Sequence, residues 1–100
     1  MDEIIKRYKG RTTSQGHKLE VSREGDEVAI GFKHLGEYGD EYDPYMRVAI
    51  IKELDRGFAL SLFYRDAEEP TAAGDFASER DLFAALDKAV EERSKEVGPI

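Results

Sequence analysis

The chain of 100 residues carries 15 basic and 22 acidic side chains, a formal net charge of −7 at neutral pH. That length, without internal repetition, predicts a single domain over 1–100 with one compact core. The absence of cysteine excludes a disulfide framework, a thiolate metal site and a thiol nucleophile. No apolar run approaches the roughly 18 residues that span a bilayer, and the acidic start is unlike a secretory signal, so we expect a cytoplasmic protein without membrane association.

The charge is unevenly distributed along the chain. Residues 1–23 carry six basic and three acidic side chains, a balance of +3, whereas residues 36–100 carry eight basic and sixteen acidic ones, a balance of −8. An acidic body repels nucleic acid and anionic membranes and attracts basic partners. Acidity also keeps a small protein soluble, so the charge by itself does not establish a partner.

The N-terminal segment fits two structures. The spacing of Ile4, Ile5 and Tyr8 predicts a short helix over 2–9 that is capped by Asp2. The same residues also fit a short edge strand, and the sequence leaves both open. A polar connector over 11–16 follows.

Alternation of apolar and polar residues from residue 17 onward predicts a first β-hairpin. Leu19 and Val21 are the apolar positions of its first strand, and a turn over 23–26 contains a glycine. The apolar positions of the returning strand are Val28, Ile30 and Phe32.

A second hairpin is predicted from Tyr45–Leu54 and Phe58–Arg65, joined by a three-residue loop that ends in Gly57. In its first strand, the alternation places Met46, Val48 and Ile50 on one face and Ala49 and Ile51 on the other.

The C-terminal third predicts a loop and then a helix. Residues 66–77 are acidic and rich in small residues, and we expect a loop with Phe76 as its anchor. Ser78 with Asp81 three residues later predicts a capped helix that runs to about Val97. Its apolar stripe consists of Leu82, Phe83, Leu86, Ala89, Val90 and Val97.

Together these elements predict an α+β fold. It consists of a four-stranded antiparallel meander of two consecutive hairpins, a long C-terminal amphipathic helix packed on one face, and a possible short N-terminal helix. The other face would serve a homodimer or a ligand, or would be closed by the N-terminal segment. That face would present Ala29, Gly31, Ala49, Ile51, Ser61 and Phe63.

Residues 37–45 form the most distinctive stretch, with three tyrosines and four carboxylates. Tyrosine rings are favoured at binding surfaces, and carboxylates select arginine or lysine on a partner. We therefore predict binding of a basic protein surface here, while an ordinary long hairpin connection fits as well. A calcium loop is not expected, because the spacing of the acids does not match an EF-hand. The predicted partner-binding residues are Tyr38, Asp40, Glu41, Tyr42, Asp43 and Tyr45.

An alternative surface lies near the N-terminus, where basic residues surround an aromatic one. Basic side chains with a stacking ring suit single-stranded nucleic acid, although a solvated terminus gives the same pattern. The residues of this alternative are Lys6, Arg7, Tyr8, Lys9 and Arg11.

His17 and His34 are the two histidines of the chain and could act as a general base, or bind a metal with Glu37. No phosphate loop, nucleophile elbow or metalloprotease motif accompanies them. We therefore predict no catalytic residue, metal or cofactor. The leading hypothesis is a small, acidic, non-catalytic adaptor or inhibitor-like module. Nucleic-acid binding is the alternative, and a histidine-dependent enzyme is a third.

Overall fold

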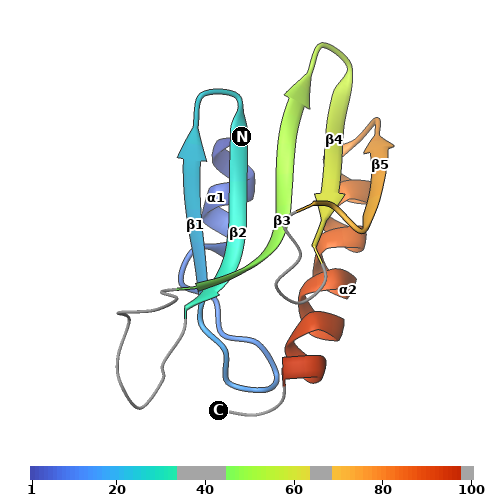
Figure 1. Cartoon of the computed structure of the whole chain (residues 1–100). Coiled ribbons are helices and arrows are strands. Elements are labelled where there is room, and N and C mark those ends of the chain that lie inside the picture. The colour runs from blue at the N-terminus through green and yellow to red at the C-terminus, as the bar shows by residue number, and fades with distance from the viewer. Residues whose placement is uncertain (34–44, 64–68, 98–100) are drawn as a thin grey trace.

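The computed structural model describes residues 1–33, 45–63 and 69–97 (Figure 1). In chain order its elements are α1 (Asp2–Tyr8), β1 (Leu19–Glu24), β2 (Glu27–Lys33), β3 (Tyr45–Leu54), β4 (Gly57–Leu62), β5 (Ala72–Phe76) and α2 (Glu79–Val97). Within these ranges, neither helix combines the length and the apolar character needed to cross a membrane.

The strands form one antiparallel sheet in the order β1-β2-β3-β4-β5. The α+β class, both hairpins and the C-terminal helix are confirmed, but the predicted count of four strands is wrong. Ala72–Phe76, which the sequence predicts as loop, pairs with β4 as a fifth strand, with Phe76 opposite Phe58. Alanine, glycine and aspartate are weak strand formers, so pairing with the free edge of β4 determines this strand more than its own residues do.

The core face of β3 differs from the predicted one at Ala49, Ile50 and Ile51, whereas Val48 is buried in the core as predicted. Val28 pairs with Ile51 and Ile30 pairs with Ala49, so both β3 residues lie on the core face and are fully buried. The register shifts between Ile30 and Gly31, where the extra residue of β3 forms a bulge. The predicted open-face positions of Ala49 and Ile51 are therefore wrong.

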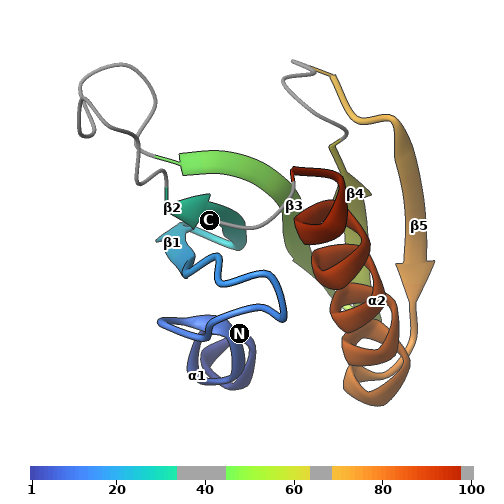
Figure 2. The same ribbon diagram turned by 90° about the horizontal axis from the view of Figure 1, so that it is seen from below.

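Both helices cover the same face of the sheet (Figure 2). α1 packs against β1, and α2 packs against β3, β4 and β5. The short N-terminal helix is thus confirmed, and it lies beside α2 instead of closing the second face. The predicted cap is wrong, because Met1 is the N-cap residue and the Asp2 carboxylate instead accepts a hydrogen bond from Arg23.

The core lies between the sheet and the two helices. α1 contributes Ile4 and Tyr8 to it. α2 contributes Leu82, Leu86 and Val90, whereas Val97, predicted for the same stripe, is 38% exposed near the helix end. The predicted cap of α2 is confirmed, because the Asp81 N–H donates to the Ser78 hydroxyl over 3.2 Å.

Candidate interaction surface

The predicted partner-binding loop begins and ends on paired strands. Tyr45 opens β3 and pairs with Lys33 at the end of β2. Eleven residues, 34–44, run between these two positions. His34 and Glu37 lie outside the described residues, as do the loop residues Tyr38, Asp40, Glu41, Tyr42 and Asp43.

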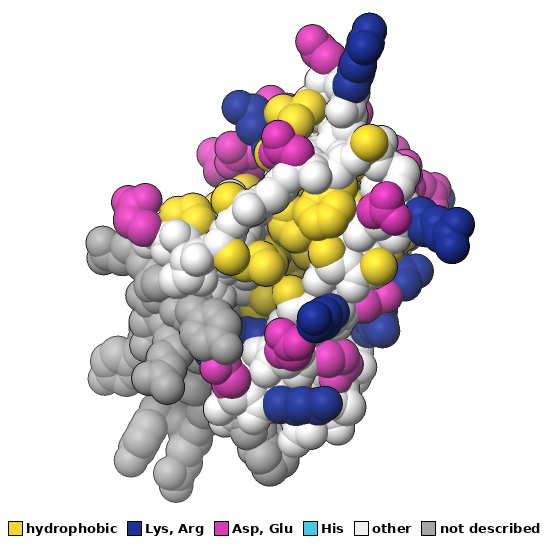
Figure 3. Space-filling view, turned by 90° about the vertical axis from the view of Figure 1, so that its right-hand side faces the viewer, with side chains coloured by type: hydrophobic (Ala, Val, Ile, Leu, Met, Phe, Trp, Pro, Cys, Tyr) yellow, Lys and Arg dark blue, Asp and Glu magenta, His cyan; other side chains and the backbone are white. Residues whose placement is uncertain are grey.

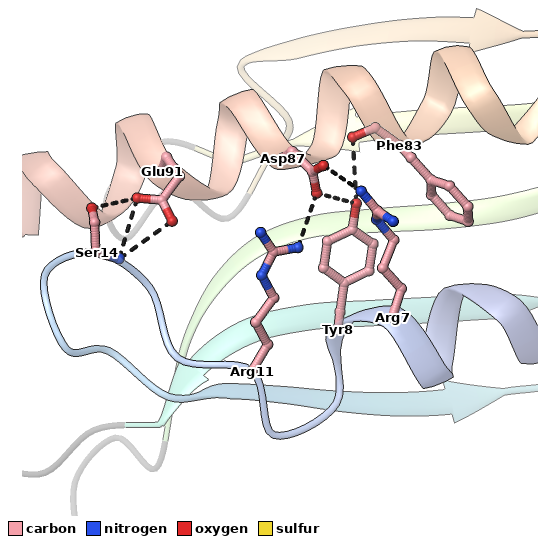
Figure 4. Close-up of polar contacts among 7 residues, drawn as sticks. All are labelled: Arg7, Tyr8, Arg11, Ser14, Phe83, Asp87 and Glu91. Carbon is pink, nitrogen blue, oxygen red and sulfur yellow. Dashed lines mark hydrogen bonds and ion pairs between the residues drawn. The ribbon is translucent and has the colours of Figure 1, made fainter.

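The N-terminal basic segment is held against α2 by Asp87 (Figure 4). The Tyr8 hydroxyl donates to one carboxylate oxygen over 2.8 Å, and Arg7 donates to the other over 2.6 Å. Arg11 adds a weaker contact of 3.3 Å. The Tyr8 side chain is fully buried, so in this arrangement its ring is not exposed for stacking on a base. Lys6 and Lys9 of the same segment are exposed.

Burial and hydrogen bonding fix the protonation states of this cluster. Burial, reinforced by the hydrogen bond to Asp87, raises the pKa of the Tyr8 hydroxyl far above its ordinary value, so the hydroxyl remains a donor. Burial alone would raise the pKa of Asp87, but hydrogen bonds from Arg7 and Tyr8 outweigh it and the pKa is lowered. The carboxylate therefore stays charged and holds the hydroxyl and both guanidinium groups.

The connector after α1 contacts α2 further along the helix. The hydroxyls of Thr13 and Ser94 are buried and share a hydrogen bond of 2.6 Å. Ser14 donates to the carboxylate of Glu91, one helical turn from Asp87 (Figure 4). Sequence analysis missed these contacts because no local pattern links residues separated by about 80 positions.

His17 lies in the interior, where 6% of its surface is exposed. Its ring stacks on Phe32, with the ring centroids 5.0 Å apart and the planes inclined by 27°. Over the described residues, no group of three or more His, Cys, Asp or Glu side chains is placed to hold a metal ion. The prediction of a histidine-dependent enzyme stays a prediction, and this position resembles that of a packed core residue.

The sheet face that no described element covers carries small side chains beside one larger apolar residue, Ile50. Ala29, Ile50 and Ser61 are direct neighbours across β2, β3 and β4 and are half-buried. Of the residues predicted for this face, Gly31 and Phe63 are buried, whereas Ala29 and Ser61 remain on it. Beside Ile50, a shallow depression of about 160 Å³ reaches Glu24 and Glu27, which are cross-strand neighbours.

The outer edge of β1 borders a larger groove of about 450 Å³. One side of the groove is formed by Lys9 and Gly10, just after α1. The other side is formed by residues 18–22 of the edge strand and its start. Lys9 and Lys18 are both exposed.

The opposite edge of the sheet is apolar. Viewed from the β5 side, apolar side chains gather in a hollow between β5 and α2 (Figure 3). Partly buried Phe58, Phe76 and Ala85 pack against the core in this region. β5 itself is exposed from Ala72 to Asp75, so only a strand of small residues covers this end of the core.

No protein-family model, curated protein or solved structure matches this chain. Its function is therefore inferred from its own residues and from their arrangement.

Proposed function

We propose that the protein is a small acidic interaction module without catalysis of its own, which binds a basic protein surface through residues 37–45. One observation carries this proposal. Eleven residues connect the paired ends of β2 and β3, whereas hairpin loops usually need about two to five. Long loops held by rigid strands commonly carry binding residues.

The composition of this connection supports the same function. Tyr38, Tyr42 and Tyr45 supply large rings with a polar end, which bind with a low loss of side-chain entropy. The carboxylates among them complement lysine and arginine on a partner. Residues 36–100 carry a balance of −8, which would accelerate association with a basic surface at low salt.

The test is an affinity pull-down from the native cell lysate at low salt. The wild type is compared with a Tyr38→Ala, Tyr42→Ala, Tyr45→Ala variant, and with an Asp40→Asn, Glu41→Gln, Asp43→Asn variant that keeps the size of each side chain. We expect the wild type to retain a basic protein and both variants to lose it. A Lys6→Gln, Lys9→Gln variant is the control, because it changes charge outside the loop. A partner retained equally by all four proteins would contradict the proposal.

Nucleic-acid binding through Lys6, Arg7, Tyr8, Lys9 and Arg11 stays the alternative prediction. It has less support, because Tyr8 is buried and both arginines contact Asp87. Retention of nucleic acid by the wild type and by both loop variants, with loss in the Lys6→Gln, Lys9→Gln control, would favour it.

Homodimerisation through the uncovered sheet face also stays a proposal, now centred on Ile50. Replacing this half-buried residue by lysine would put a charge into such an interface. A dimer of the wild type and a monomer of Ile50→Lys in analytical ultracentrifugation would support it, and identical sedimentation of the two proteins would contradict it.

A further inference from the structure

β1 is an edge strand whose outer side is partly occupied by its own chain. The Leu19 N–H donates to the Arg11 carbonyl over 2.8 Å, and the Gly10 N–H donates to the Leu19 carbonyl over 3.2 Å. Backbone groups of a strand alternate between its two sides, so those of Val21 and Arg23 also point away from β2. Across the described residues, no backbone hydrogen bond occupies them. Two donors and two acceptors therefore face outward.

The groove beside this edge has one closed and one open end. Residues 10–11 close it at Leu19, and from Val21 to Glu24 no backbone hydrogen bond among the described residues occupies the outer side of the strand. Lys9 and Lys18 lie at the closed end. Neither lysine takes part in an ion pair with the described residues.

We propose that this groove binds the C-terminal segment of a partner protein as an added strand, antiparallel to β1. The unpaired groups of Val21 and Arg23 would hydrogen-bond its backbone. An added strand along Val21 to Glu24 must end beside Leu19, because residues 10–11 already hydrogen-bond the backbone of Leu19. An antiparallel strand brings its carboxyl end there, and a parallel one would bring its amino end. Lys9 and Lys18 favour the carboxylate, which selects the antiparallel direction.

A second copy of this chain fits the groove less well. Antiparallel pairing of two β1 strands that uses both Val21 and Arg23 is centred on Ser22. It places Glu20 of each copy opposite Glu24 of the other, and like charges directly opposite one another destabilise a sheet. The occupant is therefore another protein. This inference goes beyond the proposed function and does not depend on residues 37–45.

The probe is a one-bead-one-sequence library of synthetic octapeptides attached through their N-termini, so that their carboxyl ends are free. The best-bound sequences are resynthesised with a free carboxylate and with a C-terminal amide, and both are titrated by fluorescence anisotropy. We expect the free acid to bind at least about fivefold more tightly, since two exposed ion pairs contribute modestly. Equal affinity of the two forms, or an absence of binding sequences, would overturn the proposal.

Three variants locate the site. Lys9→Gln, Lys18→Gln should abolish the preference for the free acid, whereas Lys6→Gln, Lys95→Gln, with the same change of charge, should keep it. Val21→Pro removes an outward N–H without removing a hydrogen bond to β2, and should weaken both peptide forms. Thermal unfolding checks that Val21→Pro folds. If it does not fold, the lysine variants alone locate the peptide site. An unchanged preference in Lys9→Gln, Lys18→Gln would also overturn the proposal, and the Tyr38, Tyr42, Tyr45 alanine variant should bind normally.

Discussion

The two flanks of α2 are held in different ways. On the flank that faces the N-terminal segment, polar groups make directed contacts: Asp87 binds the Tyr8 hydroxyl, and Ser94 pairs with Thr13 in the interior. On the flank that faces β4 and β5, the contacts are apolar, and Figure 3 shows a hollow lined by hydrophobic side chains. The N-terminal segment is therefore fixed in one orientation, whereas β5 is held by backbone pairing and by Phe76.

This difference changes the interpretation of the basic segment. Its two arginines and its tyrosine, which in the sequence resemble a nucleic-acid surface, converge on one carboxylate of α2. A polar cluster in which every member has a partner favours one packing arrangement, and the tyrosine at its centre is fully buried. We infer that Arg7, Tyr8 and Arg11 contribute chiefly to docking α1, which leaves Lys6 and Lys9 as the cations of the segment that form no ion pair with the described residues.

The largest expected effect comes from removing the tyrosine at the centre of the polar flank. Tyr8→Ala deletes a fully buried ring and leaves part of Asp87 without a donor, so we expect a loss of about 3 to 5 kcal/mol in the free energy of unfolding. Phe76→Ala is the matched change on the apolar flank and should cost about 1 to 2 kcal/mol, because that ring is only half-buried. Urea titrations measure both. Equal losses would show that the two flanks do not differ in strength.

The next effect concerns the attachment of β5. Gly57 has φ +110°, and a Cβ atom there would collide with the carbonyl oxygen of Phe76. Gly57→Ala should therefore cost about 2 to 4 kcal/mol and loosen β5 from β4. Gly25→Ala is the control, because Gly25 also has a positive φ of +63° but has nothing near its Cβ position. It should cost about 1 kcal/mol.

Amide hydrogen exchange gives a second measure of Gly57→Ala. We expect faster exchange in β5 than in β1 and β2, since the collision involves the backbone that joins β5 to α2. Exchange that rises uniformly over the sheet would mean that β5 is not a separate weak point.

The hairpins were predictable because their signals are local. A period of two, interrupted by a glycine-containing turn, identifies β1 with β2 and β3 with β4, and both pairings are found. β5 was missed, since Ala72–Phe76 has no such period. This segment becomes a strand only because it pairs with the edge of β4. Residues 49–51 of β3 were assigned to the wrong faces because the bulge opposite Ile30 and Gly31 changes the alternation, and the composition of a strand does not reveal a bulge.

The candidate sites show the same limit. The composition of residues 37–45 is visible in the sequence, and their binding role stays a prediction because most of them lie outside the described ranges. The contacts of Arg7 and Tyr8 with Asp87 join positions about 80 residues apart, which no local pattern encodes. The groove at β1 depends on which strand lies at the edge of the sheet, and that order follows from tertiary pairing.

The smallest expected effect separates the Tyr8 hydroxyl from its ring. Tyr8→Phe keeps the buried ring and should cost about 1 kcal/mol at neutral pH, because one hydrogen bond is lost while Asp87 keeps its two arginine donors. Folding raises the pKa of this hydroxyl above the ordinary value of about 10. The contribution of the hydroxyl is therefore complete below pH about 10 and decreases above it, where the unfolded chain releases the proton and the folded chain keeps it. The difference in free energy of unfolding between the wild type and Tyr8→Phe should shrink as the pH rises from about 9 to about 11, while the other tyrosines titrate alike in both proteins. A difference that stays constant over this range would mean that the hydroxyl is not held as a donor to Asp87, and that Asp87 holds the N-terminal segment through the arginines alone.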